Sequence, residues 1–84
     1  MYDQNYPNPF NPVTKIDFAL QKAGFVSLKV YDYIGREISL LVSKEMDQGA
    51  HSVTFDASGL SSGVYFYRLE VNGFTQTKKM TFVK

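Results

Sequence analysis

LSSGVYFYRLEV, residues 60–71, predicts the central β-strand of the protein. Successive side chains of a strand face opposite ways, so one face carries only apolar or aromatic residues and the other carries Arg68 and Glu70. Leu60 and Gly63 introduce the strand, and a tyrosine follows the glycine by two positions, which is the layout of a tyrosine corner. In that motif the phenol ring packs inside and its hydroxyl bonds back to the preceding connection. The stretch therefore predicts an all-β, immunoglobulin-like β-sandwich with these inward residues: Tyr65, Tyr67, Leu69 and Val71.

Alternating apolar residues predict further antiparallel strands on both sides of this stretch. Their ranges are 14–20, 25–32, 36–43, 50–56 and 74–84, which makes about six to seven short strands in all. The inward residues expected from the first four ranges are Ile16, Phe18, Leu20, Val26, Leu28, Val30, Ile38, Leu40, Val42, His51, Val53 and Phe55.

Turn residues separate these strands. Asp32 and Gly35 stand first and fourth in a four-residue turn, the preferred type I pattern. Asn72-Gly73 is the strongest hairpin signal and predicts a type I′ turn before the last strand. A polar loop is expected over residues 43–49.

The third strand has a helical alternative. Residues 36–48 also place apolar side chains at helical spacing, so a short helix is possible there. The preceding turn and the early Gly49 favour a strand. The helical set is Ile38, Leu41, Val42 and Met46.

The last strand has a problem of phase. Met80 and Phe82 are expected to face inward, but the same alternation turns Gln76 and Lys78 inward as well. Either a bulge near Lys78 and Lys79 restores the alternation, or the first half of the strand lies outside the sandwich.

Composition limits the function classes. With 84 residues, 44% of them hydrophobic, the chain is one small globular domain over residues 13–84. The net charge of +1 and the lack of a basic stripe argue against nucleic-acid binding. No apolar run is long enough for membrane insertion, and no signal peptide is visible. We expect an excised module of a longer exported protein, without cysteines for disulfides or thiolate metal sites.

Residues 1–12 predict an extended, proline-rich lead-in. This segment holds all three prolines, and a strand edge tolerates their missing N–H groups better than a central strand does. Tyr6 and Phe10 are the expected anchors on the domain. The alternative is a proline-rich ligand for another protein, because Pro9 and Pro12 have P-x-x-P spacing.

The sequence offers little catalytic chemistry. His51 is the single histidine, and its place in a strand favours a structural role. No nucleophile elbow and no phosphate-binding glycine loop is present. We therefore expect no enzyme and no cofactor. A calcium site is the one alternative left open, through oxygen ligands at the ends of a sandwich: Asp32, Asp47 and Asp56.

Four ordered blocks of this sequence resemble the type A C-terminal sorting domain of type IX secretion substrates. The first is YPNPFNP at residues 6–12, followed by Thr14, Ile16 and Phe18. The others are VSLKVYD (26–32) with GRE (35–37), then DASGL (56–60) with GVYFYRL (63–69), and KKM (78–80) with Val83 and Lys84. One departure is Gln21, where the family usually has proline. The immunoglobulin-like domain of the flagellar hook-capping family is a related resemblance.

The resemblance implies a C-terminal sorting module that directs an attached N-terminal cargo through the type IX outer-membrane translocon. The cargo would pass through the periplasm to the cell surface or the medium, where a sortase-like peptidase acts. The residues it implies for the sorting signal are Gly63, Tyr65, Tyr67, Leu69, Lys78, Lys79, Met80, Val83 and Lys84. Those it implies for the structural motif are Pro7, Asn8, Pro9, Phe10, Asp32, Gly35 and Leu60.

The alternative function is a structural or adhesive module of a multidomain surface protein. Such a module would hold neighbouring domains, as in a hook cap, or bind glycan on an exposed aromatic platform. The outward aromatic candidates are Tyr31, Tyr33 and Phe66.

Overall fold

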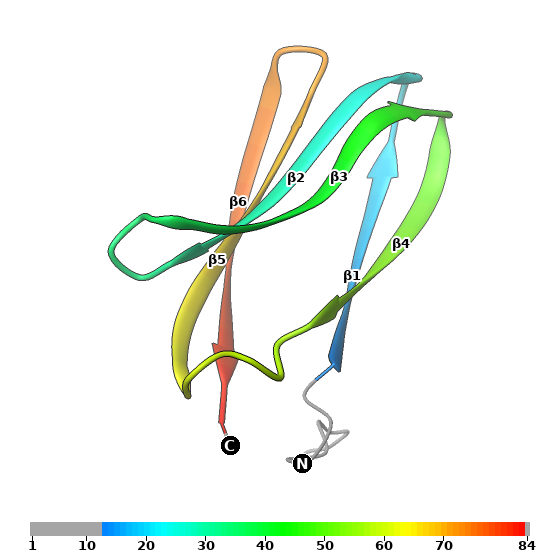
Figure 1. Ribbon diagram of the computed structural model, residues 1–84. Helices are drawn as coiled ribbons and strands as arrows, with labels where there is room; N and C mark the ends of the chain where they lie inside the picture. The colour runs from blue at the N-terminus through cyan, green and yellow to red at the C-terminus, as the bar shows by residue number, and fades with distance from the viewer. Residues whose placement is uncertain (1–12, 84) are drawn as a thin grey trace.

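The computed structural model describes residues 13–83, which form six antiparallel strands and no helix. The predicted all-β fold is confirmed (Figure 1). The strands are β1 (Val13–Leu20), β2 (Gly24–Asp32), β3 (Glu37–Met46), β4 (Gly49–Asp56), β5 (Gly63–Val71) and β6 (Phe74–Phe82).

The strands form two sheets that share one core. β1 pairs with β4, and the second sheet has the order β3-β2-β5-β6. β5 is central in that larger sheet, as residues 60–71 predict, and β6 is its edge. Figure 1 shows that β1 begins and β6 ends at the same end of the molecule. The core joins apolar side chains of both sheets: Ile16, Leu20, Val26, Leu28, Val30, Val42, Phe55, Ala57, Tyr65, Leu69, Val71 and Phe82.

The tyrosine corner is confirmed. The Tyr65 ring is buried, with 8% of its surface exposed. Its hydroxyl donates a hydrogen bond of 2.8 Å to the backbone oxygen of Ser61. The same side chain therefore fills the core and holds the connection that leads into β5.

Both predicted turns are present. Gly35 N–H donates to the backbone oxygen of Asp32 at 3.0 Å, which closes the turn between β2 and β3. Asn72 and Gly73 have φ angles of 52° and 77°. Two consecutive positive φ angles are the signature of the type I′ hairpin.

β3 is a strand, so the helical alternative is wrong. The strand continues to Met46, so the loop is shorter than the range expected for it, residues 43–49. Two register shifts against β2 insert extra residues at Ile38 and Leu41. The expected inward position of Leu40 is therefore wrong: it pairs with outward-facing Lys29 and is 53% exposed. Leu41 packs on the core in its place.

β6 has no bulge. Its register with β5 is continuous from Gly63↔Phe82 to Val71↔Phe74. The side chains from Phe74 to Lys79 are exposed, whereas Met80 is half-buried and Phe82 is buried. Of the two alternatives for the last strand, the bulge is therefore wrong. The first half of β6 lies outside the covered part of the sandwich, as the second alternative predicts.

Candidate functional site: the surface of strands β5 and β6

The register of β5 and β6 brings most of the predicted sorting-signal residues side by side. Tyr65 lies opposite Met80, and Tyr67 lies opposite Lys78. The two segments are separate in the sequence, but the Asn72-Gly73 hairpin folds one onto the other. The predicted residues that the structure describes thus lie on two adjacent strands or directly after them.

These residues differ in exposure, and the difference separates supporting from accessible positions. Tyr65 and Leu69 are buried, and Tyr67 and Met80 are half-buried against the core. Lys78, Lys79 and Val83 are exposed, Val83 at 76%. A partner can therefore touch the three exposed side chains directly, whereas the buried ones shape the strands that carry them.

Tyr67 lies at the border of the two groups. Desolvation raises the pKa of its hydroxyl, and the nearby carboxylate of Asp17 on β1 raises it further. Both causes favour the neutral phenol, so Tyr67 presents an uncharged hydroxyl at neutral pH.

Phe82 is absent from the predicted sorting-signal and structural-motif residues, although it was expected to face inward. Its ring centroid lies 5.6 Å from that of Tyr65 and 6.1 Å from that of Phe55. This aromatic contact anchors the end of β6 to both sheets. The alternation that pointed Phe82 inward was the available signal for this role.

The outer edge of β6 has no partner strand within residues 13–83, because β6 pairs with β5 alone. Its outward backbone N–H and C=O groups are available for pairing with another chain. Charged side chains on an edge strand, here Lys78 and Lys79, limit unwanted pairing between copies.

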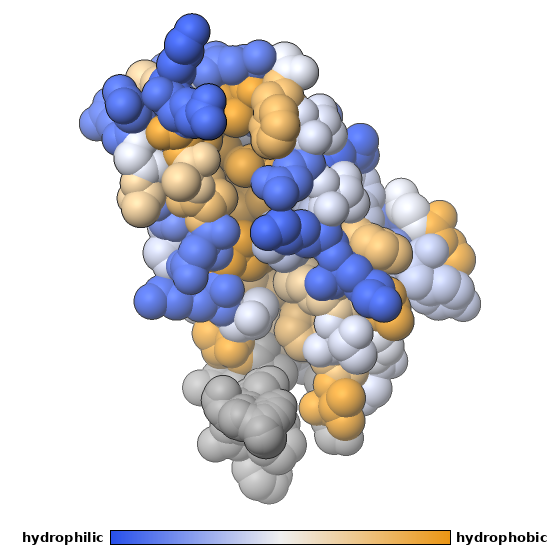
Figure 2. Space-filling model, turned by 180° about the vertical axis from the view of Figure 1, so that it is seen from behind, coloured by the Kyte–Doolittle hydropathy of each residue, from blue (hydrophilic) through white to orange (hydrophobic). Residues whose placement is uncertain are grey.

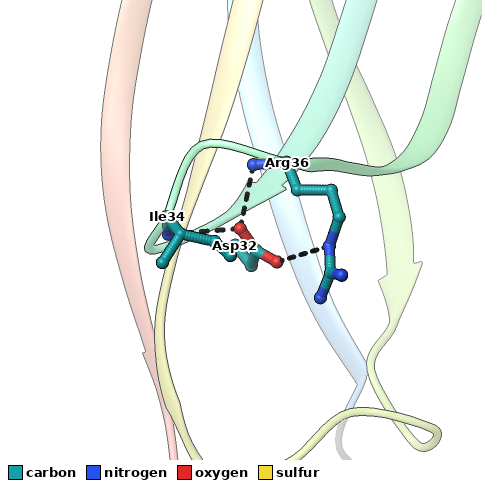
Figure 3. A network of polar contacts seen from close by, with 3 residues as sticks. All are labelled: Asp32, Ile34 and Arg36. Carbon is teal, nitrogen blue, oxygen red and sulfur yellow. Dashed lines mark hydrogen bonds and ion pairs between the residues drawn. The ribbon is translucent and has the colours of Figure 1, made fainter.

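The predicted structural motif includes a polar network in the turn after β2 (Figure 3). Asp32 is 9% exposed, and its carboxylate accepts hydrogen bonds from the backbone N–H groups of Ile34 (3.2 Å) and Arg36 (2.9 Å). It also accepts one from Arg36 Nε at 3.0 Å. The backbone N–H of Arg36 is the main cause that lowers the pKa of Asp32; burial opposes it, and the Arg36 guanidinium adds to it. The ionised carboxylate therefore holds the turn.

Of the other residues predicted for the structural motif, some lie within the described part of the chain and some do not. Leu60 N–H donates to the backbone oxygen of Ala57 at 3.0 Å, in the connection before β5. Gly35 takes a φ of 90° in the Asp32 turn, a conformation that favours glycine. The remaining predicted residues lie outside the described part of the chain: Pro7, Asn8, Pro9, Phe10 and Lys84.

The three candidate calcium ligands have separate local contacts. Asp32 holds its own turn, and the Asp56 carboxylate accepts a 2.9 Å hydrogen bond from the backbone N–H of Ser58, which lowers the Asp56 pKa. The backbone oxygen of Asp47 lies 2.6 Å from His51 Nε2. Across residues 13–83, no three Asp, Glu, His or Cys side chains are grouped as a metal site needs.

The outer face of the larger sheet carries a stacked pair, Tyr31 and Arg68. The Arg68 guanidinium lies 4.7 Å from the centroid of the Tyr31 ring and donates a 2.7 Å hydrogen bond to the Tyr31 hydroxyl. One face of that ring is thus covered by a cation. Tyr31 is therefore a poor platform for a glycan.

Together, these features define an immunoglobulin-like β-sandwich in which, across residues 13–83, β6 has an unpaired outer edge. A family model described as "Secretion system C-terminal sorting domain" matches residues 4–84. The chain therefore belongs to this family, the type IX sorting domains that its sequence blocks resemble. No curated protein and no solved structure matched the chain. Within the described residues, no helix is long and apolar enough to cross a membrane.

Proposed function

We propose that this domain directs an attached N-terminal cargo protein through the type IX outer-membrane translocon to the cell surface or the medium. The observation that carries the proposal is the family match over residues 4–84, which spans every described strand. A sorting domain acts by being recognised, so its function depends on what it exposes.

The terminal strand is the part that the secretion machinery would contact first. Among residues 13–83, β6 combines an unpaired backbone edge with exposed Lys78 and Lys79, and Val83 follows it at 76% exposure. A receptor strand can add to such an edge by main-chain hydrogen bonds, while the lysines favour an acidic partner. We propose this strand addition as the mechanism of recognition.

The chain itself would act without catalysis. Asp32 and Asp56 serve turns, and the single histidine lies beside a backbone oxygen and the Phe18 ring. We propose that a surface sortase-like peptidase supplies any cleavage step, with this domain as its substrate.

An export assay tests the proposal. Residues 1–84 are fused to the C-terminus of a periplasm-directed fluorescent reporter, in a type IX-competent host and in a translocon-null strain. Reporter on the surface or in the medium only with an intact translocon is the expected result. Reporter trapped in the periplasm of both strains, with the domain folded, would contradict it and favour the structural or adhesive alternative.

The terminal strand needs a test that leaves the fold intact. Deletion of residues 80–84 removes Phe82, which packs on Tyr65 and Phe55, so lost export would be ambiguous. Exposed positions avoid this problem, and Lys79→Glu combined with Val83→Ser should lower export while the unfolding midpoint stays unchanged. Lys44→Glu on β3, also exposed, is the matched control and should export normally. Full export of the double variant would remove β6 from the recognition mechanism.

A further inference from the structure

A cleft opens between the two sheets on the side flanked by β1 and β6. It has a volume of about 450 Å³, and its floor includes Leu28, Leu69 and Val71, which are core residues. Seen from behind, the upper half of the molecule is hollowed, and apolar surface lies in the hollow between hydrophilic side chains (Figure 2). The cleft therefore reaches core side chains, which stay buried at its floor.

The cleft arises from the unequal widths of the sheets. The β1-β4 sheet has two strands and faces a sheet of four strands. In the first half of β6, alternate side chains still point to the inner face of the sheet, but they are left uncovered. Phe74 and Lys78 consequently line the cleft, and Phe74 is 57% exposed although its alternation is that of a core position.

The walls of the cleft fit an extended peptide. β1 pairs with β4 alone and β6 with β5 alone, so within the described residues each flanking strand has one unpaired backbone edge. A lipid or a compact apolar ligand would leave those N–H and C=O groups unsatisfied, whereas a strand pairs with them. Every second side chain of such a strand would point into the apolar floor.

The charges at the rim specify the peptide further. The lining includes Lys22 and Lys78, and neither has an ion-pair partner within residues 13–83. The one acidic residue of the lining is Asp17, whose carboxylate accepts a 2.6 Å hydrogen bond from the Ser52 hydroxyl. With two lysines against this one aspartate, the lining has a net positive charge, which favours a carboxylate.

We propose that this cleft docks an extended segment of a partner protein that is apolar at alternate positions and carries a carboxylate near Lys78, while Lys22 adds to the positive charge of the rim. The segment completes the open side of the sandwich, as a donated strand. This inference rests on the proposed function for its biological role, but its physical content is tested separately from export.

The probe is a fluorescein-labelled synthetic peptide of about ten residues that alternates Val with Thr and carries one central Glu. Fluorescence anisotropy with the purified full chain should show binding, and a scrambled peptide of the same composition should not bind. Phe74→Ser should weaken binding about tenfold, because the peptide loses one large apolar contact. Lys78→Glu should also weaken it and remove the preference for the Glu peptide over its Gln counterpart.

Matched controls lie at exposed positions away from the cleft lining. Phe25, 54% exposed on β2, corresponds to Phe74, and Lys44 on β3 corresponds to Lys78. Phe25→Ser and Lys44→Glu should bind the peptide as the parent chain does. Circular dichroism and unfolding midpoints establish that all four variants fold. Undetectable binding, or equal binding by all variants, would overturn the proposal.

Two other occupants of the cleft are separate outcomes that would also overturn it. A second copy would give a concentration-dependent dimer that Phe74→Ser abolishes, seen by sedimentation. If the chain's own residues 1–12 occupied the cleft, they would prevent the peptide from binding. Lys78→Cys introduces the single cysteine of the chain, and a spin label attached to it would then broaden the NMR signals of residues 1–12. Export and peptide binding fail independently: export with no binding rejects the cleft alone, and binding with no export rejects the sorting role alone.

Discussion

At the residue scale, single polar contacts explain why particular side chains stand at particular turns. The Tyr65 hydroxyl and the Asp32 carboxylate each connect a strand to the turn beside it, over four residues or fewer. Such local bonds contribute modestly to stability, but an unmade partner in a half-buried place costs more than the bond itself contributes.

Tyr65→Phe should lower the free energy of unfolding by about 1 kcal/mol, since it removes one hydrogen bond and keeps the ring in the core. Chemical denaturation measures the difference. Tyr33→Phe is the matched control, because Tyr33 is 75% exposed, and it should leave stability unchanged. Equal effects of the two substitutions would show that the corner hydrogen bond does not stabilise the fold.

Asp32→Asn should make the protein less stable at neutral pH and change its response to acid. The pKa of Asp32 is lowered in the folded state from 3.8, so its contribution is present above pH 3.8 and is lost as the pH falls through the lowered value. The difference in thermal midpoint between the parent and the variant should therefore be largest above pH 3.8 and shrink below it.

Asp47→Asn serves as the control substitution, because no hydrogen bond to the Asp47 carboxylate is found within residues 13–83. It should leave the thermal midpoint at neutral pH unchanged. A difference between Asp32→Asn and the parent that persists unchanged into strong acid would show that the ionised carboxylate does not hold the turn.

At the element scale, β3 shows how bulges decide which side chains reach the core. Simple alternation selected Ile38, Leu40 and Val42, but two register shifts turn Leu40 outward and Leu41 inward. Ile38, Leu41, Val42 and Met46 pack on the core, and their spacing along the sequence is that of a helix. The reason is that each bulge inserts one extra residue into the two-residue alternation of the strand.

Leu41→Ala should cost about 1 to 3 kcal/mol of unfolding free energy, because a partly buried leucine side chain leaves the core. Leu40→Ala, at 53% exposure, should change it by less than about 0.5 kcal/mol. Urea unfolding of the pair compares adjacent residues with the same chemistry. The reverse order of effects would place Leu40 in the core and contradict the bulges.

At the scale of the whole molecule, the terminal strand has two roles at opposite ends. Its second half closes the core through Phe82, while its first half lines the open cleft through Phe74 and Lys78. A domain of 84 residues without disulfides has a stability of only a few kcal/mol, so it depends on this closure.

Phe82→Ala should cost about 3 to 5 kcal/mol and unfold most of the protein, because the ring contacts residues of both sheets. Val83→Ala, at the neighbouring exposed position, should leave stability unchanged. Circular dichroism with urea measures both. A folded, stable Phe82→Ala variant would show that the end of β6 is dispensable for the fold and that its deletion is a clean test of export.

The sequence alone determined the features that depend on local interactions. Strand alternation, the positive φ angles of Asn72 and Gly73 and the Tyr65 corner all act over a few residues, so residue types and spacing were sufficient to predict them. The same holds for the family, which four ordered sequence blocks predicted and the match over residues 4–84 confirmed.

Only the tertiary structure decided which of those residues are accessible. The exposure of Phe74 and Lys78 depends on how far β1, a distant part of the chain, covers them across the cleft. The exposure of Leu40 depends on the bulges in the pairing of β3 with β2. The narrow β1-β4 sheet leaves part of the wider sheet uncovered, and β3 takes bulges to match β2. Sequence alternation specifies the face on which a side chain lies, but only the packing of the two sheets specifies whether that face is covered.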